Sequence, residues 1–290
     1  MNSRIECAFD EIDAWLFDGD GVLYHENEPL PGALEVLTIL QEQQKEVFLL
    51  TNNSTKTRVE FQEKLSTMGV ELEEKRILTS AFLTAKFISD ESPNSAVYVI
   101  GEDGLKKELE DSGLKVVNNF LEKNDDEIFD FELSNIDYVV TGMDRKLNYV
   151  KIARAMNILG KIDSDIRFIA TNADITFPTI KGLVPGGGAM IDILEKLSGK
   201  KVEKIVGKPQ PIMYEIAVDM AKCPKEKVMM FGDRLETDIV GAKKFGILAC
   251  FVNSGTSSLD ELVKMPSGLS PDVIISSLSD ILKEIRKSYS

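Results

Sequence analysis

Short apolar runs alternate with segments of helical periodicity along almost the whole of this 290-residue sequence. The runs are rich in aliphatic and aromatic residues, as in AWLFD (14–18) and KVMMFG (227–232). Between such runs, apolar residues recur at helical spacing, for example over 31–43 and 57–68. Strands that are apolar throughout and alternate with helices indicate a parallel sheet covered on both faces. The sequence therefore predicts an α/β fold with a doubly wound parallel sheet.

Two breaker-rich linkers divide this pattern into a core and an insertion. The first linker is SDESPNS (89–95) and the second is SGKK (198–201). The strand–helix pattern restarts after each of them. We expect residues 1–92 and 203–290 to form a Rossmann-like core, and residues 93–202 to form an inserted α/β domain.

The composition excludes several classes of protein. The 34 basic and 48 acidic residues give a net charge of −14, and the sequence has no basic patch of the kind that binds nucleic acid. No apolar run approaches the length of a membrane span, and we expect no signal peptide. The scattered Cys7, Cys223 and Cys250 lack zinc-site spacing, so we expect reduced thiols in a cytoplasmic protein. The single histidine, His25, argues against His-rich metal sites and Ser-His pairs. The acidic stretch 121–132 is interpreted as a solvated surface.

Polar and ionisable residues follow four of the predicted core strands. In open α/β sheets, ligands bind beyond the carboxyl ends of the strands. The predicted edge residues are Asp18 and Asp20 at the end of 14–18, Thr51, Asn52 and Asn53 at the end of 46–51, Lys208 after 203–207, and Asp233 and Asp238 after 227–232. Their coincidence at one edge of the sheet predicts a reaction centre there.

The Asp-Gly pairs after the first strand allow two other interpretations. Asp-Gly between apolar runs is a strong hairpin signal, but the residues that follow, VLYHENEPLPG, soon become charged and proline-rich. A calcium loop starting at Asp18 would need Asp or Asn, Gly and Glu where the sequence has Val22, Leu23 and Pro29. The strand-end interpretation is therefore favoured.

A carboxylate at this edge can act as a nucleophile, because its pKa near 4 leaves it ionised at neutral pH. Its natural electrophile is phosphorus. The aspartates would repel a phosphate dianion, and Mg²⁺ bound by one or two carboxylates, together with Lys208, would relieve that repulsion. Thr51 and the N–H groups after it can hold phosphate oxygens. Asp20 can protonate the leaving oxygen and then activate water.

Each of these residues taken alone has an ordinary structural explanation. Asp233 can be a turn residue and Lys208 a surface lysine. The segment TNNST can cap the helix over 57–68, and Asp238 can be a first-turn helix acid or a support for its neighbours. Only their joint arrangement favours a phosphoryl-transfer site.

The motifs FDGDGVLY, LLTNNSTKTR, VGKP and FGDRLETDI resemble those of the haloacid dehalogenase (HAD) superfamily of phosphatases. The segments LPGALEVL, TGMDRKLNY, ATNADITFPT and VPGGGAMI extend the resemblance to its 4-nitrophenylphosphatase branch. That branch includes phosphoglycolate and pyridoxal phosphate phosphatases, and the resemblance covers nearly the whole chain. It implies a Mg²⁺-dependent phosphatase that forms an aspartyl-phosphate.

The resemblance also implies a role for each edge residue. It makes Asp18 the nucleophile and Asp20 the general acid/base. Mg²⁺ would be bound by Asp18, by the backbone carbonyl of Asp20 and by Asp233, with Asp238 as a supporting residue. Lys208 would hold the nucleophile and the phosphate, and the other phosphate-binding residues would be Thr51, Asn52 and Asn53. The inserted block corresponds to the family's cap domain, which often mediates dimers, so a homodimer through the cap is expected.

Two positions bear on variation within the family. Relatives frequently carry a bulkier residue at Gly19, and since Gly19 has no proposed role we expect tolerance there. The loop TNADITFP resembles the family's specificity loop, with Phe177 where pyridoxal phosphate phosphatases place a histidine. Phe177 is therefore a candidate substrate-binding residue, with cap core as its alternative. This departure counts against a vitamin B6 phosphatase.

The favoured function is hydrolysis of small phosphomonoesters such as phosphoglycolate, with 4-nitrophenyl phosphate as an artificial substrate and a small phosphorylated metabolite as the partner. The alternatives are a pyridoxal phosphate or nucleotide phosphatase, and a phosphotransferase or mutase on the same core. A non-enzymatic binding protein is disfavoured, because no catalytic position is replaced.

Overall fold

The structure, a computed structural model, describes residues 9–118, 135–161, 165–179, 181–254 and 257–287. The chain divides into two compact units. The first unit is built from Met1–Thr51, Arg58–Leu78 and Lys208–Ser290, and the second from Asn52–Thr57 and Thr79–Gly207. The acidic stretch 121–132 and Cys7 lie outside the described residues.

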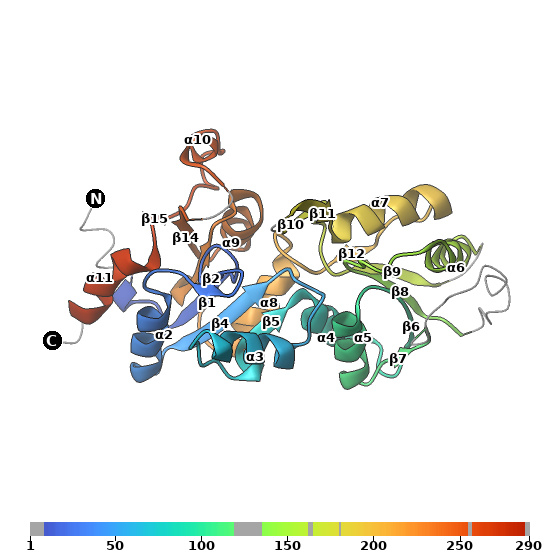
Figure 1. Ribbon diagram of the computed structural model, residues 1–290, viewed down its shortest axis with the longest axis horizontal. Coiled ribbons are helices and arrows are strands. Elements are labelled where there is room, and N and C mark those ends of the chain that lie inside the picture. Colours follow the sequence, from blue (N-terminus) through green and yellow to red (C-terminus); the bar gives the residue numbers. More distant parts are fainter. Residues whose placement is uncertain (1–8, 119–134, 162–164, 180, 255–256, 288–290) are drawn as a thin grey trace. The chain divides into compact units, whose positions relative to one another are not determined.

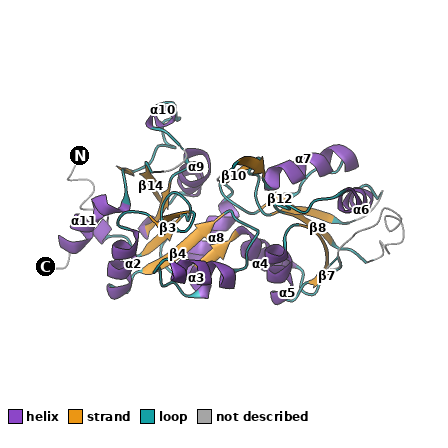
Figure 2. Ribbon diagram, viewed as in Figure 1, coloured by secondary structure: helices purple, strands orange, loops and turns teal. Residues whose placement is uncertain are grey.

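The first unit is a parallel sheet with the strand order β15-β14-β13-β1-β4-β5. Its helices appear with the sheet in Figures 1 and 2. The strands are β1 (Ala14–Phe17), β4 (Glu46–Thr51), β5 (Ile77–Thr79), β13 (Val228–Gly232), β14 (Leu248–Val252) and β15 (Val273–Ile275), with a small hairpin of β2 (Tyr24–His25) and β3 (Glu28–Pro29). The helices are α2 (Ala33–Glu42), α3 (Arg58–Thr67), α8 (Pro211–Ala221), α9 (Val240–Phe245), α10 (Leu259–Leu262) and α11 (Leu282–Lys287), with helical turns at Glu74–Arg76, Lys225–Lys227, Leu235–Ile239 and Leu278–Ile281.

The sheet of the first unit is buried on both faces. In β1, Trp15 and Phe17 join the core cluster that includes α2 side chains such as Leu37. Leu16 and Phe48 lie on the opposite face and are also buried, where α8 packs against β1 and β4. Because both faces are covered, the strands are apolar throughout rather than alternating. This confirms the predicted doubly wound parallel sheet.

The second unit is a second parallel sheet, with the order β12-β9-β8-β6-β7. Its core is formed by buried side chains of β6, β8, β9, α6 and α7. The strands are β6 (Ala96–Ile100), β7 (Lys115–Val116), β8 (Tyr138–Thr141), β9 (Arg167–Ala170) and β12 (Lys204–Ile205), with an antiparallel hairpin of β10 (Thr176–Thr179) and β11 (Gly182–Pro185). The helices are α4 (Ser80–Glu91), α5 (Asp103–Asp111), α6 (Tyr149–Leu159) and α7 (Gly187–Ser198).

One predicted core strand belongs to the other sheet. Residues 203–207 were expected to form a strand of the core, but β12 pairs with β9 of the second unit. The pairing continues beyond the strand, because the N–H of Val206 donates to the carbonyl of Ala170 at 3.0 Å. That expectation is therefore wrong, although Lys208 directly after this segment belongs to the first unit.

The compact units also differ from the predicted boundaries at residues 93 and 202. Helix α4 belongs to the second unit because it packs against α5. The other side of the second unit ends at Gly207.

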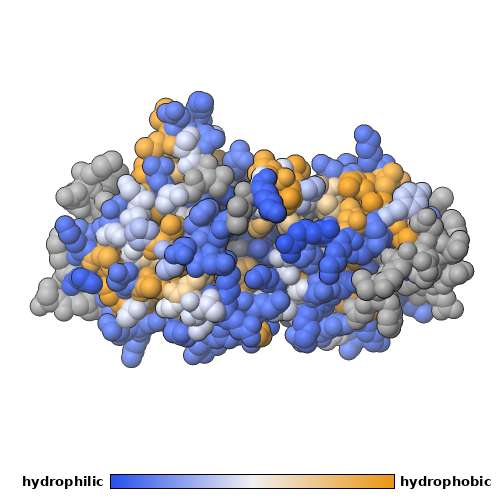
Figure 3. Space-filling view, in the orientation of Figure 1, coloured by the Kyte–Doolittle hydropathy of each residue, from blue (hydrophilic) through white to orange (hydrophobic). Residues whose placement is uncertain are grey.

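Hydrophilic side chains cover most of the face seen in Figure 3, and the apolar side chains on it form scattered patches. Within the described residues, none of the helices combines the length and apolar character that crossing a bilayer requires.

Candidate active site

Asp18 lies at the carboxyl end of β1, where the sheet edge places it beside β13. Its backbone N–H donates to the carbonyl of Phe231 at 2.9 Å, which extends the parallel pairing by one residue. The residue is only 8% exposed. A carboxylate buried to this degree needs charged or hydrogen-bonding partners, and Lys208 is the first of them.

Residues 19–24 form a loop that folds back on itself. The carbonyl of Gly19 accepts hydrogen bonds from the N–H groups of Leu23 and Tyr24 at 2.9 and 3.1 Å. The N–H of Gly21 donates to the carbonyl of Tyr24 at 2.8 Å. The Asp-Gly pairs therefore follow the end of a parallel strand and do not connect β1 to an antiparallel partner.

Lys208 is the cation of the site. Its Nζ lies 2.7 Å from Oδ1 of Asp18, 2.7 Å from Oδ1 of Asp238 and 2.9 Å from the carbonyl oxygen of Leu50. These three acceptors match the three protons of an ammonium group. Burial favours the neutral amine, but the charges of Asp18 and Asp238 outweigh burial and raise the pKa of Lys208 above its ordinary value. The lysine is therefore a fixed positive charge.

Asp233 follows β13 and is almost fully buried. Gly21 has a φ of +87°, in the left-handed region that favours glycine. A Cβ added to Gly21 would lie 2.3 Å from Oδ2 of Asp233. Glycine is required at residue 21 for its backbone conformation and because the Asp233 carboxylate occupies the space of a side chain.

Asp238 lies in a π-helical turn over Leu235–Ile239 and is fully buried. Its Oδ2 accepts the N–H of Arg234 at 3.1 Å, while its Oδ1 faces Lys208. Burial raises the pKa of Asp238 to about 7, and Lys208 opposes this rise. The two oxygens of Asp238 thus contact the Lys208 ammonium and the backbone N–H of Arg234, and its supporting role stays a prediction.

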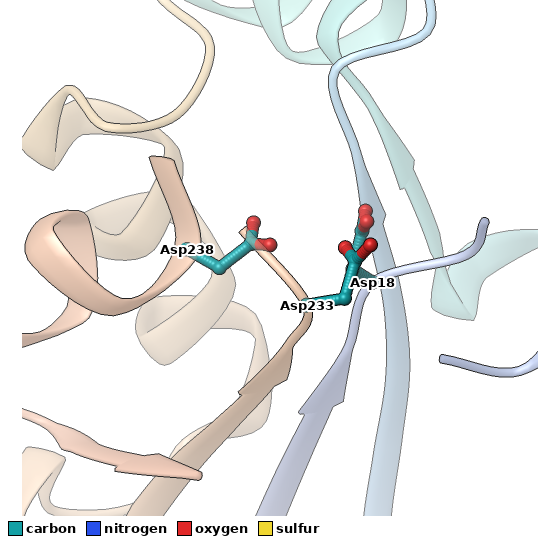
Figure 4. Close-up of side chains that lie close together, drawn as sticks. All are labelled: Asp18, Asp233 and Asp238. Carbon is teal, nitrogen blue, oxygen red and sulfur yellow. The ribbon is translucent and has the colours of Figure 1, made fainter. Parts of the chain in front are cut away.

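The three aspartates form one cluster of potential metal ligands. One carboxylate oxygen each of Asp18, Asp233 and Asp238 lies within 4.8 Å of the others. Figure 4 shows the three carboxylates pointing toward a common region. Three carboxylates and one ammonium carry a formal charge of −2, and a hard dication with oxygen ligands would neutralise it. The donor set therefore fits Mg²⁺.

Asp20 differs from the other aspartates because its side chain is exposed. Oδ1 of Asp20 lies 3.2 Å from Nδ1 of His25, which is exposed as well. His25 had no predicted role. Its separation of five residues from Asp20 was the only signal of this contact in the sequence.

The residues after β4 have engaged side chains. Thr51 ends the strand and is buried. Nδ2 of Asn52 lies 3.2 Å from Oδ2 of Asp174, within the second unit. Oδ1 of Asn53 accepts hydrogen bonds from the N–H and the hydroxyl of Thr55 at 2.8 and 2.9 Å. The side chains of Asn52 and Asn53 thus stabilise their own loop. The sequence contained no signal for the contact with Asp174, because Asp174 lies 122 positions from Asn52.

Phe177 lies in β10, paired with Val184 of β11, and is half-buried. The exposed side chains of Ile175 and Leu183 lie on or next to the same hairpin. Whether Phe177 binds substrate stays a prediction. The glycine-rich segment 185–189 leads into α7, which begins at Gly187.

The predicted tolerance at Gly19 conflicts with the geometry of the loop. A Cβ added there would lie 2.4 Å from the hydroxyl oxygen and 2.8 Å from the Cζ of Tyr24. Tyr24 is 3% exposed and its ring lies 3.8 Å from Nζ of Lys64, so the ring has little freedom to move. We therefore correct that expectation. Gly19 is required for space.

Comparison with known proteins places this chain in a family. Residues 15–115 match a family model described as haloacid dehalogenase-like hydrolase, and residues 205–281 match one described as HAD-hydrolase-like. The acid sugar phosphatase of Staphylococcus saprophyticus is 33% identical over 274 residues, which are 94% of this chain and 98% of that relative.

Solved structures agree with these matches. The 4-nitrophenylphosphatase from Thermotoga maritima superposes with a TM-score of 0.84 at 30% identity, covering 95% of this chain and 98% of that one. The p-nitrophenyl phosphatase from Archaeoglobus fulgidus gives a TM-score of 0.83 at 31% identity, covering 94% of this chain and 98% of that one.

Proposed function

The chain belongs to the haloacid dehalogenase-like hydrolases, and we propose that it hydrolyses small phosphomonoesters with Asp18 as the nucleophile. Membership in this family and the phosphatase relatives confirm the expected enzyme class, a phosphoric monoester hydrolase. The observation that carries the proposal is the buried group of Asp18, Asp233, Asp238 and Lys208 at one edge of the first unit's sheet.

In the proposed first step, Oδ2 of Asp18 attacks the phosphorus, because Oδ1 is held by Lys208. A bond forms between Oδ2 and phosphorus, and the ester P–O bond breaks. Asp20 donates a proton to the leaving oxygen, a role that suits its exposed side chain. In the second step water attacks the phosphorus, Asp20 accepts its proton, and phosphate departs from Asp18.

We assign Mg²⁺ to the carboxylates of Asp18 and Asp233, with the backbone carbonyl of Asp20 as the third protein ligand expected in this family. When bound, the ion would neutralise charge on the transferring phosphoryl group and orient it. Lys208 contributes a second positive charge beside the nucleophile. Thr51 is assigned to a phosphate oxygen, and Asn52 and Asn53 remain proposed phosphate-binding residues.

The substrate class is proposed as small acid phosphates of the phosphoglycolate type. A second candidate class, acid sugar phosphates, is supported by the names of the staphylococcal relatives. A panel of phosphate esters compared by kcat/KM decides between them, since that ratio measures discrimination directly. Product analysis with an added acceptor sugar tests the phosphotransferase alternative.

The experiment that tests the proposal measures turnover of 4-nitrophenyl phosphate with Mg²⁺ and with EDTA. We expect EDTA to stop turnover and Asp18→Asn to lower kcat by at least about a thousandfold while the thermal midpoint of unfolding stays near that of the wild type. Asp13→Asn is the matched control, because Asp13 is partly exposed and pairs with Lys45 and Lys227. Wild-type turnover by Asp18→Asn would overturn the proposal.

A further inference from the structure

Tyr24 is a buried tyrosine in the loop that follows the nucleophile. The residue is 3% exposed, and its ring lies beneath Nζ of Lys64 at 3.8 Å. A Cβ at Gly19 would lie 2.4 Å from its hydroxyl oxygen, so the hydroxyl occupies the place where a side chain at residue 19 would be. Residue 19 separates Asp18 from Asp20. The hydroxyl therefore lies against residue 19, which stands between the two proposed catalytic residues in the chain, and the charges of Asp18 and Asp20 both act on it.

The backbone of the loop fixes this placement. The N–H of Tyr24 donates to the carbonyl of Gly19 at 3.1 Å, and its carbonyl accepts the N–H of Gly21 at 2.8 Å. An isolated β-bridge also pairs the backbone of Tyr24 with that of Asp20. The backbone of residue 24 is therefore tied to residues 19–21, which fixes the point from which the Tyr24 side chain extends.

The hydroxyl of Tyr24 is a donor without an acceptor in the part of the chain that the structure describes. No residue there forms a hydrogen bond with it, although the side chain is more than nine-tenths buried. Burial, with the charges of Asp18 and Asp20, raises the pKa of Tyr24 well above its ordinary value. The group therefore keeps its proton at neutral pH. The hydroxyl oxygen is not among the fully enclosed polar atoms that lack a partner, so solvent reaches it and an acceptor from outside the chain can reach it as well.

We propose that the Tyr24 hydroxyl donates a hydrogen bond to an oxygen of the substrate's phosphoryl group, and that Gly19 is the residue that admits it. This rests on the proposed function, in which Asp18 receives that phosphoryl group. The Tyr24 hydroxyl lacks a hydrogen-bond acceptor in the described residues. An oxygen of the phosphoryl group bonded to Asp18 is an anionic acceptor that the proposed reaction brings to this site. Tyr24 is thus a substrate-binding residue, and Gly19 and Tyr24 form a pair matched in size.

The test compares inhibition by inorganic phosphate for wild type and Tyr24→Phe, with 4-nitrophenyl phosphate as substrate and Mg²⁺ present. Hydrogen bonds to charged groups are worth enough to predict inhibition that is roughly 10- to 100-fold weaker in Tyr24→Phe. The thermal midpoint of this variant should not fall, because the lost hydroxyl has no partner in the described residues. A purely structural hydroxyl would lower the midpoint and leave phosphate inhibition unchanged.

The matched control is Tyr98→Phe. Tyr98 is equally buried, but its hydroxyl donates to the carbonyl of Lys151 at 3.4 Å in the second unit. We expect wild-type inhibition by phosphate in this variant, so that any general effect of removing a buried hydroxyl is excluded.

Gly19→Ala supplies a second, independent variant. The Cβ added at residue 19 would displace the Tyr24 hydroxyl, so inhibition by phosphate should weaken in this variant. Gly19→Ala should weaken inhibition less in the Tyr24→Phe background than in the wild type, because the hydroxyl is already absent there. Additive effects would contradict the pairing of the two residues.

The outcomes separate this inference from the proposed function. If Asp18→Asn abolishes turnover but Tyr24→Phe retains wild-type inhibition by phosphate, only the role of Tyr24 is overturned. A lower kcat in Tyr24→Phe with unchanged phosphate inhibition also overturns it, because the hydroxyl would then serve Asp20 rather than the phosphoryl group. Undiminished turnover by Asp18→Asn removes the premise itself.

Discussion

The two units contain parallel sheets of the same kind, but the carboxyl edges of those sheets carry different residues. In the second unit, small and neutral residues follow the strands, such as Gly101 after β6, Gly142 after β8 and Thr171 after β9. In the first unit, Asp18 and Asp233 follow adjacent strands. The sheet supplies an edge in both cases, and the residues that follow the strands decide whether that edge can do chemistry.

The balance of charge differs in the same way. Farther along the loops of the second unit, Glu102 pairs with Arg145 at 2.6 Å and Asp144 pairs with Lys151 at 2.7 Å. Each of these two acids has a base of its own. At the edge of the first unit, three buried aspartates lie close together, and Lys208 pairs with two of them, Asp18 and Asp238. A balanced pair stabilises a loop, whereas a buried cluster with a formal charge of −2 indicates a site that binds a cation.

Lys208→Met should give the largest effect on catalysis, because it leaves the buried aspartates without their cation. We expect kcat to fall by about 10²–10³ and the free energy of unfolding to fall by about 3–5 kcal/mol. Lys227→Met is the control, since Lys227 forms a half-exposed ion pair with Asp13 at 3.0 Å and should cost at most about 1 kcal/mol. Steady-state kinetics and urea denaturation measure both quantities, and equal effects of the two variants would contradict the comparison.

Gly21→Ala should give the next largest effect, because its Cβ would push against the Asp233 carboxylate. We expect kcat/KM to fall by roughly 10- to 100-fold. Gly113→Ala carries the same kind of backbone strain, with a φ of +84° and no atom within 4 Å of the added Cβ. If both variants lose stability alike and only Gly21→Ala loses activity, the close approach to Asp233 is the cause. Equal activities would sink that explanation.

Asp144→Asn breaks the buried pair of the second unit and should affect stability alone. Removing one partner of such a pair leaves the other uncompensated, so we expect the free energy of unfolding to fall by about 3–5 kcal/mol. The kcat/KM of the folded enzyme for 4-nitrophenyl phosphate should equal that of the wild type. A loss of turnover comparable to that of Lys208→Met would erase the distinction between balanced and unbalanced charge.

The smallest expected effect is a dependence of stability on pH. The pKa of Asp238 is raised to about 7 in the folded state, so the proton bound to Asp238 stabilises that state. This stabilisation is fully present when the pH is below the ordinary pKa near 4. That contribution is lost as the pH rises from about 4 through about 7. In EDTA, the free energy of unfolding of the wild type should therefore fall relative to Asp238→Asn across this range. A constant difference between the two proteins would show that the carboxyl group is not perturbed.

Much of the fold could be predicted from the sequence, because buried parallel strands are continuous apolar runs. AWLF and VMMFG, for example, became β1 and β13. The site residues at these strand ends could be predicted for the same reason. Asp18 and Asp233 came together because adjacent parallel strands end at one edge. The wrong assignment of residues 203–207 arose because β12 is a strand of only two residues, Lys204–Ile205, and so short a run contains no signal of its sheet.

The remaining features depend on contacts between side chains that no local pattern encodes. The contact of Asn52 with Asp174 joins residues far apart in the sequence, and the hairpin of β10 and β11 contains little apolar alternation. The crowding of Gly19 by Tyr24 depends on the path of a loop and on the direction of one ring. Such details follow from packing, and only the structure shows them.

The most direct test of Asp18 as the nucleophile uses the Asp20→Asn variant with 4-nitrophenyl phosphate. The leaving group of this substrate needs little protonation, so the first step should proceed while the activation of water fails. We predict a burst of one equivalent of 4-nitrophenol per enzyme and, after acid quenching and digestion, the mass of one phosphoryl group on the peptide that contains Asp18. A burst with the phosphoryl group on another residue, or wild-type steady turnover without a burst, would contradict the account.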